Sequence, residues 1–177
     1  MRIIGGTHRG KVLKAPNGLP TRPTTDFAKE GLFNILNNRI DFEGIEVLDL
    51  FCGTGNISFE FASRGAKLVT AVDEHGKCIA YIQKEAAALK LDCINTQRGN
   101  VFKFLAQTGR PYDLIFADPP YDIPNYLELQ NLLVTNNWLK EDGLLLIEHP
   151  KKTDFTSAPL FKETRNYGNV NFSFFGR

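Results

Sequence analysis

The residues best suited to chemistry follow a short apolar run, where the sequence reads Asp118-Pro119-Pro120-Tyr121. The run, residues 114–117, is typical of a buried strand in a parallel sheet whose two faces are both covered. The prolines end that strand because they have no N–H group and hold φ at about −65°. Open α/β sheets bind ligands at the carboxyl ends of their strands, so these four residues are candidates for a site. We expect catalytic roles for Asp118, Pro119 and Tyr121.

The chemistry that this group offers is recognition of an exocyclic amino group on a nucleobase. Such an amine has two N–H donors, which the Asp118 carboxylate and the Pro119 carbonyl can accept. A base taken out of its stack needs a flat partner, which Tyr121 can supply. The same residues also fit an ordinary β-turn after a core strand, in which Asp118 caps the turn and Tyr121 packs against its neighbours. A second motif upstream favours the interpretation as a site.

The second motif runs from Asp49 to Gly55 with the sequence Asp-Leu-Phe-Cys-Gly-Thr-Gly, after another apolar run. Gly53 and Gly55 allow the backbone to approach a ligand closely, and the helix that follows them directs N–H donors towards it. Asp73 comes about 20 residues later, at the end of the next strand, where an acidic residue can accept hydrogen bonds from a ribose diol. The residues expected to contact a cofactor are Asp49, Cys52, Gly53, Gly55, Asp73, Glu74, Asn100 and Asp118.

These features fit two kinds of cofactor, a dinucleotide or S-adenosylmethionine. The glycine fingerprint of dinucleotide sites is broken, because Ser58 stands where the third glycine belongs. Asp49 places a carboxylate in the loop, which disfavours a pyrophosphate and favours the cationic S-adenosylmethionine. We therefore expect S-adenosylmethionine as the cofactor. Asn100 ends a third strand, where it either presents its amide to the adenine or caps the following helix.

Length and composition are those of one globular domain, with 177 residues of which 42% are hydrophobic and 23% are charged. No apolar run approaches the ~20 residues that span a bilayer, and the first residues show no signal-peptide pattern. The three cysteines, Cys52, Cys78 and Cys93, are widely spaced, which predicts neither a metal site nor a disulfide framework. A reducing cytoplasm is the expected location, without a membrane or a metal as partner.

Charge is distributed unevenly along the chain. Residues 1–40 include seven basic and two acidic residues, a net +5, whereas the remainder includes 14 basic and 18 acidic residues, a net −4. A basic head on an acidic body is typical of proteins that bind a polyanion, and charge runs also occur on solvated surfaces. Arg22, together with Thr24, equally fits a position over the cofactor. His8, in the same basic segment, is expected to face the RNA or simply to be exposed in its loop. The candidates for phosphate contacts are Arg2, Arg9, Lys11 and Arg22.

The order of the predicted elements is that of an α/β fold with an open, mostly parallel sheet. Residues 2–14 are expected to form a hairpin around a glycine-rich loop, followed by a linker over residues 15–23. Predicted strands cover residues 46–51, 68–72, 93–98, 114–117, 144–148, 161–165 and 170–175. Predicted helices cover residues 24–39, 57–64, 76–90, 101–107 and 125–136. Residues 1–23 are therefore expected to be an arm, and residues 24–177 the main domain.

Several aromatic and histidine side chains are expected to be structural. Phe33, Phe51 and Trp138 are predicted to lie in the core rather than to stack on a base. His75 and His149 have no chemical partner that the sequence makes evident.

Together the motifs resemble those of the RsmD family, bacterial methyltransferases that act on the N2 amine of guanine in 16S ribosomal RNA. The resemblance covers nearly the whole chain, and the N-terminal residues narrow it to this family, since many amino-methyltransferases share the Asp-Pro-Pro-Tyr motif. Cys52 stands where the family usually has alanine, and Asn100 stands where aspartate is common. The stretches that carry the resemblance are residues 1–6, 9–10, 22–26, 32–34, 47–55, 63–66, 118–121 and 167–170.

The resemblance implies a Rossmann-like, class I S-adenosylmethionine-dependent methyltransferase sheet of seven strands, the last antiparallel, with an N-terminal hairpin and helix as an extension. It implies ribosomal RNA as the partner, in the small subunit or an assembly intermediate, and we expect a monomer. A DNA adenine or cytosine N-methyltransferase shares the Asp-Pro-Pro-Tyr motif but usually carries a sizeable target-recognition region, which the sequence lacks. A non-catalytic RNA-binding assembly factor that retains the cofactor pocket is the alternative from another class.

Overall fold

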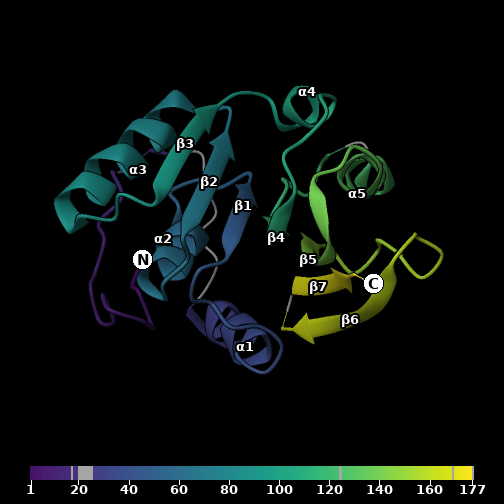
Figure 1. Cartoon of the computed structure of the whole chain (residues 1–177), viewed down its shortest axis with the longest axis horizontal. Helices are drawn as coiled ribbons and strands as arrows, with labels where there is room; N and C mark the ends of the chain where they lie inside the picture. The colour runs from purple at the N-terminus through teal and green to yellow at the C-terminus, as the bar shows by residue number, and fades with distance from the viewer. Residues whose placement is uncertain (17, 20–25, 124, 169, 177) are drawn as a thin grey trace.

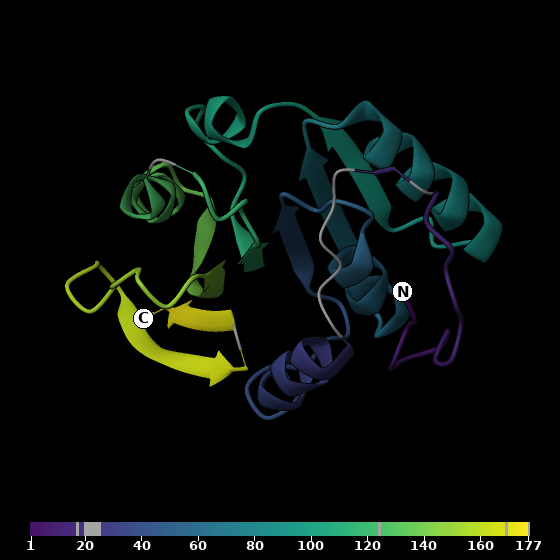
Figure 2. The same cartoon turned by 180° about the vertical axis from the view of Figure 1, so that it is seen from behind.

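Strands and helices alternate along the chain in the computed structural model, which describes residues 1–16, 18–19, 26–123, 125–168 and 170–176 (Figures 1 and 2). The alternation is that of an α/β fold, as predicted. The strands are β1 (Glu46–Leu50), β2 (Leu68–Asp73), β3 (Ile94–Arg98), β4 (Tyr112–Ala117), β5 (Leu139–His149), β6 (Phe161–Tyr167) and β7 (Val170–Phe175). The helices are α1 (Asp26–Leu36), α2 (Asn56–Ser63), α3 (Gly76–Leu89), α4 (Val101–Leu105) and α5 (Tyr126–Thr135).

These seven strands form one sheet in the order β3-β2-β1-β4-β5-β7-β6. Neighbouring strands from β3 to β5 are parallel, and β7 runs antiparallel to both of its neighbours. The predicted Rossmann-like sheet with an antiparallel last strand is therefore confirmed. The chain passes from β1 to β2 on one side and later returns to β4 on the other side, so the strand order reverses between β1 and β4. Open α/β sheets bind their ligands at such a reversal, beyond the carboxyl ends of the strands.

Each face of the sheet has its own hydrophobic core, because successive residues of a strand point to opposite faces. On one face, Val47 of β1 packs in a cluster that includes residues of α1, α2 and α3. On the other face, Leu48 packs in a cluster with α4 and α5. Both side chains are fully buried, as expected for a strand that is covered on both sides. Phe33 and Trp138 lie in these two cores, as predicted.

The N-terminal hairpin is present but short. A β-bridge pairs Arg2 with Val12, and the Ile3 N–H donates to the Lys11 carbonyl at 2.9 Å. Ile3 and Leu13 are buried and belong to the same core cluster as α1 and α2. Both sides of the hairpin are therefore anchored to the rest of the chain by hydrophobic packing.

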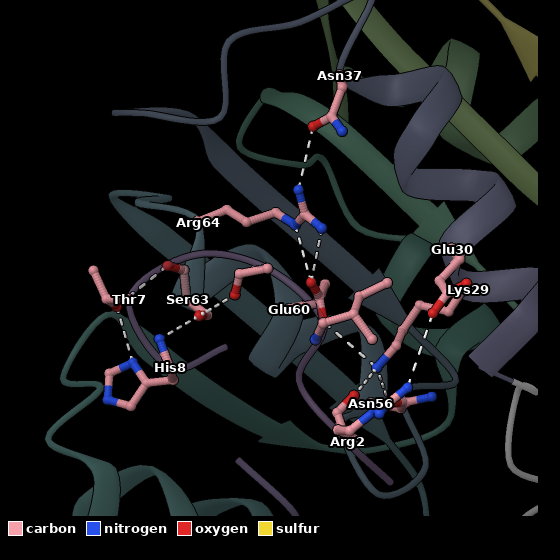
Figure 3. Close-up of polar contacts among 12 residues, drawn as sticks. Arg2, Thr7, His8, Lys29, Glu30, Asn37, Asn56, Glu60, Ser63 and Arg64 are labelled. Carbon is pink, nitrogen blue, oxygen red and sulfur yellow. Dashed lines mark hydrogen bonds and ion pairs between the residues drawn. The ribbon is translucent and has the colours of Figure 1, made fainter. Parts of the chain in front are cut away.

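The loop at the tip of the hairpin contacts α2, as Figure 3 shows, and also contacts α3. The N–H groups of Thr7 and His8 donate to the carbonyl and the hydroxyl of Ser63, at 2.7 and 2.9 Å. Nε2 of His8 lies 3.1 Å from the carbonyl oxygen of Leu89. Gly6 allows this approach, because it has a φ of 72° and a Cβ on it would meet the Ser63 carbonyl at 1.8 Å. His8 is consequently half-buried, so the alternative in which it is simply exposed is wrong, and the alternative in which it faces the RNA stays a prediction.

A buried ionic network links the arm to α1 and α2 (Figure 3). The side chains of Lys29 and Glu60 are completely buried, and Lys29 Nζ lies 3.4 Å from a Glu60 carboxylate oxygen. Lys29 also donates to the Arg2 carbonyl at 2.5 Å and to the Asn56 side chain at 2.9 Å. The other Glu60 oxygen accepts from two guanidinium nitrogens of Arg64, at 3.0 and 2.9 Å. The first strand of the arm is thus fixed by hydrogen bonds as well as by packing.

Element boundaries differ from the predicted ones by a few residues. α1 ends at Leu36 rather than near Arg39, and residues 37–39 form a turn because the two asparagines there favour turns over helix. β5 begins at Leu139, well before the predicted strand, since Leu139 pairs with Tyr112 ahead of a register shift. Within the described ranges, none of the helices has the length and apolar character needed to cross a membrane.

Candidate functional site

A cavity of about 850 Å³ opens beyond the carboxyl ends of the strands, where the strand order reverses. All three residues predicted to be catalytic line this cavity, and so do all predicted cofactor residues except Gly55. The predicted residues in its lining are Asp49, Cys52, Gly53, Asp73, Glu74, Asn100, Asp118, Pro119 and Tyr121. Motifs that lie far apart in the sequence are therefore brought to one edge of the sheet.

The loop between β1 and α2 has a left-handed backbone at three residues. Phe51, Gly53 and Gly55 have φ values of 57°, 52° and 77°. A Cβ on Gly55 would meet Ile82 of α3 at 2.9 Å, so this glycine lets the loop turn into α2 against α3. Gly55 is therefore needed for the shape of the loop but does not itself line the cavity. Phe51 packs partly against the core but also lines the cavity, so its predicted core position is only partly right.

Asp73, at the end of β2, holds this loop in place. One carboxylate oxygen accepts the Gly53 N–H at 2.9 Å. The other accepts the His75 N–H at 2.8 Å and lies 3.0 Å from Nδ1 of the same residue. His75 therefore has a chemical partner that the sequence did not reveal. Because a carboxylate oxygen accepts more than one hydrogen bond, the oxygen bonded to Gly53 can also accept from a ligand hydroxyl.

Asp49 is a carboxylate with almost no exposure to solvent, 1%. The Ser58 hydroxyl donates to its Oδ2 at 2.5 Å. Burial raises the pKa of Asp49 to about 7, although the Ser58 hydrogen bond acts in the opposite direction. The neutral and ionised forms are both accessible near neutral pH, and a cation in the cavity favours the ionised form. Ser58, which stands in place of the third glycine of the dinucleotide fingerprint, is thus a hydrogen-bond donor to this carboxylate.

Asn100, after β3, caps a helix and lines the cavity at the same time. Its Oδ1 accepts the Lys103 N–H at 3.1 Å at the start of α4, so the capping interpretation is confirmed. Two aromatic rings lie near this end of the cavity. Phe51 and Phe102 both line it, and their ring centroids are 6.4 Å apart in an edge-on arrangement. Together they form an apolar wall that suits a flat heterocycle.

The residues after β4 form a turn whose stiffness comes from the two prolines. The Asp118 N–H donates to the Leu50 carbonyl at 3.3 Å, which ties the turn to β1. The Pro120 carbonyl accepts the Ile123 N–H at 3.1 Å, which closes the turn. In the described part of the chain, no backbone N–H donates to the Pro119 carbonyl. The cavity lining therefore includes Asp118 and, next to it in the sequence, Pro119, whose carbonyl has no such donor.

Tyr121 is held by Glu148, a residue that the sequence analysis missed. The Tyr121 hydroxyl donates to Oε1 of Glu148 at 3.3 Å. Glu148 is 5% exposed and lies near the end of β5, the neighbour of β4 in the sheet. Its place in the site could have been predicted from the sequence, since Glu148 follows an apolar run just as Asp118 does. This hydrogen bond fixes one end of the Tyr121 ring within the lining.

The remaining wall of the cavity comes from two segments that the sequence analysis did not place in the site. They are the first turns of α1 and the region where β6 ends and β7 begins. Nothing in the spacing of residues connects these segments with the motifs after β1 and β4, because only the packing of α1 beside β6 brings them together. The residues that they contribute are Phe27, Ala28, Tyr167, Gly168 and Val170.

The cavity is strongly acidic. Its described lining includes neither lysine nor arginine. The six carboxylates of the lining are Asp49, Asp73, Glu74, Asp118, Asp122 and Glu148. Such a lining disfavours phosphate groups and favours ligands that present cations or amino groups. Within the described ranges, no three His, Cys, Asp or Glu side chains are grouped so that they could hold a metal ion.

The predicted phosphate contacts lie elsewhere. Arg2, Arg9 and Lys11 are exposed residues of the arm, and none of them lines the cavity. The Arg2 guanidinium lies 3.9 Å from the carboxylate of Glu30 in α1. Arg22 and Thr24 lie outside the described residues, so neither of the two positions predicted for Arg22 is tested.

Comparison with known proteins finds similarity over the whole chain. The family described as "Conserved hypothetical protein 95" matches residues 1–176. The "Ribosomal RNA small subunit methyltransferase D" of Escherichia coli is 35% identical over 159 residues, 90% of this chain and 79% of that protein. The "Putative rRNA methyltransferase YlbH" of Bacillus subtilis is 33% identical, over 87% of this chain and 85% of that protein. The solved structure of "Putative methyltransferase yhhF" from Escherichia coli superposes with a TM-score of 0.87 at 33% identity, covering 100% of this chain and 97% of that one.

Proposed function

The chain belongs to the Conserved hypothetical protein 95 family and is a methyltransferase, and we propose that it methylates the exocyclic N2 amine of a guanine in 16S ribosomal RNA, at position 966. S-adenosylmethionine is the methyl donor. The observation that carries the proposal is the set of acceptors after β4, the Asp118 carboxylate and the Pro119 carbonyl, beside Tyr121 in an acidic cavity. The names of the relatives support the substrate class, because they include ribosomal RNA of the small subunit.

The residues at the ends of β1, β2 and β3 fit this methyl donor. When bound, S-adenosylmethionine supplies an electrophilic methyl group on a sulfonium centre. The ionised form of Asp49 stabilises the positive charge of the ligand, and Asp73 accepts hydrogen bonds from its ribose. Phe51 and Phe102 provide the apolar wall for its adenine. The residues proposed to bind this ligand are Asp49, Cys52, Gly53, Asp73, Glu74 and Asn100. Of the other two predicted cofactor residues, Gly55 shapes the loop without lining the cavity, and Asp118 acts on the target amine.

The residues after β4 act on the target amine. The lone pair of guanine N2 is delocalised into the ring, so the amine is a poor nucleophile. Asp118 and the Pro119 carbonyl accept its two hydrogens, which draws the nitrogen towards a tetrahedral geometry. The negative charge of Asp118 also stabilises the positive charge that develops on the nitrogen as the N–C bond forms and the bond between the methyl group and the donor sulfur breaks. The amine then loses one proton, and the donor is left as S-adenosylhomocysteine. Tyr121, tied to Glu148, stacks on the base and fixes its orientation.

The division of the chain follows from this proposal. Residues 1–23 are the RNA-binding arm and linker, and residues 24–177 are the methyltransferase domain. Arg2, Arg9, Lys11 and Arg22 contact phosphates, whereas the acidic cavity admits only the base and the cofactor. The contacts of Thr7 and His8 with Ser63 support an arm that is held in a fixed position before RNA binds. The enzyme acts as a cytoplasmic monomer on the small subunit or an assembly intermediate.

Transfer of radiolabelled methyl groups tests the proposal directly. The protein is incubated with labelled S-adenosylmethionine and with 16S ribosomal RNA, small-subunit particles or duplex DNA, followed by mapping of the modified nucleotide. Label on guanine N2 of the RNA is the expected result. Label on adenine or cytosine of DNA would favour a DNA N-methyltransferase instead. Binding of RNA without any transfer would favour a non-catalytic assembly factor.

A further inference from the structure

Phe27 is an exposed aromatic residue at the mouth of the cavity. It lies in the first turn of α1, lines the cavity and is 68% exposed. Val12 and Leu127, the other large hydrophobic residues that are strongly exposed in the described part of the chain, do not line it. Exposure of a phenylalanine is unfavourable in water, and an apolar surface that adjoins a binding cavity is typical of a ligand contact.

The ring of Phe27 is supported by Tyr167 at the end of β6. The two ring centroids are 6.5 Å apart, with an angle of 66° between the ring planes, so they meet edge to face. Gly31, one helical turn after Phe27, makes room for this arrangement, because a Cβ on it would meet the Tyr167 ring at 2.3 Å. Tyr167 rests in turn on Phe172 of β7, with 5.9 Å between centroids. In Figures 1 and 2, α1 lies beside the end of β6 in both views.

A cation lies near this aromatic surface. Arg2 reaches Glu30, which is three residues after Phe27 and therefore on a neighbouring part of the helix surface. An exposed ring beside a basic side chain is the combination with which proteins hold single-stranded nucleic acids, since bases stack on the ring and phosphates pair with the cation.

The order of strands separates Phe27 from the cofactor residues. Asp49 lies in β1, Asp73 ends β2 and Asn100 follows β3, and these three strands are on one side of β4 in the sheet. Tyr167, which contacts Phe27, ends β6 on the other side of β4. The position of methyl transfer at Asp118, after β4, therefore lies between the two groups. A ligand that reaches Phe27 approaches from the side of the polynucleotide rather than from that of the cofactor.

We infer that Phe27, supported by Tyr167, stacks on a nucleobase adjacent to the base that is methylated. The inference rests on the proposed function, because it requires an RNA substrate whose target base has left its stack. When the target base leaves the stack, the neighbouring base in the strand loses its stacking partner. Phe27 replaces that partner while Tyr121 holds the target, so the two rings bind successive bases.

The test uses four substitutions at Phe27 in the full-length protein. Phe27→Ala and Phe27→Leu remove the aromatic face, and we expect the KM for 16S ribosomal RNA to rise about 5- to 150-fold, the range for loss of one base–aromatic stack. Phe27→Tyr and Phe27→Trp keep the face and are expected to stay close to wild type. The affinity for S-adenosylhomocysteine, measured by calorimetry, is expected to be unchanged in all four. Leu127→Ala is the matched control, because Leu127 is also exposed and lies away from the cavity.

Phe27→Trp also gives a direct readout of stacking. Trp138 is the single native tryptophan and is buried, so quenching of fluorescence in the Phe27→Trp variant on addition of the RNA reports on the new side chain. A Phe27→Leu variant as active as wild type would show that stacking is not involved. A loss of S-adenosylhomocysteine affinity in Phe27→Ala would assign the ring to the cofactor instead. If the wild-type protein methylates RNA and the Phe27 variants do so equally well, this inference is overturned but the proposed function is not. If the wild-type protein transfers no methyl group to RNA, both are overturned.

Discussion

The carboxylates of the cavity differ because their surroundings differ. Asp49 is buried and bonded to a hydroxyl, Asp73 is engaged by backbone N–H groups, and Asp118 is half-buried at the end of β4. Burial favours the neutral form of a carboxyl group, whereas N–H donors favour the ionised form. The three aspartates are thereby suited to different tasks: Asp49 to compensating the charge of a cation, Asp73 to binding hydroxyl groups and Asp118 to activating an amine.

Substitution of Asp118 by alanine separates catalysis from cofactor binding. We expect kcat to fall about 10²- to 10³-fold, because the variant loses the group that stabilises positive charge in the transition state. The dissociation constant for S-adenosylhomocysteine is expected to change little. Asp122→Ala is the matched control, since Asp122 is an exposed carboxylate in the same stretch of the lining. Loss of both transfer and cofactor affinity in Asp118→Ala would show that its role has been misassigned.

The raised pKa of Asp49 predicts that cofactor binding depends on pH. Below about pH 7 the carboxyl group of the unliganded protein is protonated, so binding of the cationic S-adenosylmethionine must release a proton. Affinity is therefore expected to rise with pH by up to about tenfold per unit and to level off above pH 7. In the unliganded protein the same shift acts on stability, which is expected to fall as the pH rises from the ordinary value of 3.8 to about 7.

Calorimetry in two buffers with different ionisation enthalpies measures the proton released. Asp49→Asn cannot ionise, so its affinity for S-adenosylmethionine is expected to be weaker at high pH and nearly independent of pH. Replacement of Asp49 by asparagine preserves the shape of the side chain and a hydrogen-bond partner for Ser58. An equal pH dependence in wild type and in this variant would assign the proton to another group.

At the scale of elements, the arm is attached by charges that are removed from water. Glu60 forms an ion pair with Lys29 and accepts hydrogen bonds from Arg64 and from the Ile4 N–H of the arm, so one carboxylate connects three segments of the chain. Removal of one partner from such a network leaves another charge buried without compensation, which costs more than the network contributes as a whole. The position of the arm thus depends on the integrity of the network.

Substitution of Lys29 by methionine tests this attachment. We expect the free energy of unfolding to fall by about 3–5 kcal/mol, because Glu60 stays buried after it loses its ammonium partner. Chemical denaturation followed by circular dichroism measures the change. Glu30→Gln is the control, since the Arg2–Glu30 pair is exposed and its loss is expected to cost less than about 1 kcal/mol. A fall below 1 kcal/mol in Lys29→Met would mean that the network does not hold the arm.

The elements were predictable from the sequence where apolar runs end in glycine, proline or a carboxylate. The seven strands and the motif residues Asp49, Asp73 and Asp118 follow from that rule, because strand ends of a parallel sheet meet at one edge. Phe27 and Tyr167 could not be placed, since their contact depends on how α1 packs beside β6 and not on a local pattern. The docking of the hairpin tip could not be predicted for the same reason, because it requires a carbonyl of α2 and a carbonyl of α3.

At the scale of the whole molecule, charges of opposite sign are separated. The net +5 of residues 1–40 contrasts with the net −4 of the remaining chain, and the cavity concentrates six carboxylates. A polyanion is attracted to the basic part and repelled by the cavity. We therefore expect the separation to orient an RNA substrate so that its backbone follows the arm, while only an uncharged base enters the cavity.

The salt dependence of RNA binding tests this orientation. Each phosphate contact that is lost lowers the slope of log Kd against log salt concentration by about 0.7 for single-stranded RNA. Arg9→Gln with Lys11→Gln is therefore expected to lower the slope by about 1.4, measured by fluorescence anisotropy with a 16S ribosomal RNA fragment. Lys162→Gln is the control, because Lys162 lies exposed at the start of β6, at the opposite end of that strand from Tyr167, and does not line the cavity. An equal effect of Lys162→Gln would mean that RNA binding follows the total charge of the protein, and that the arm has no special part in it.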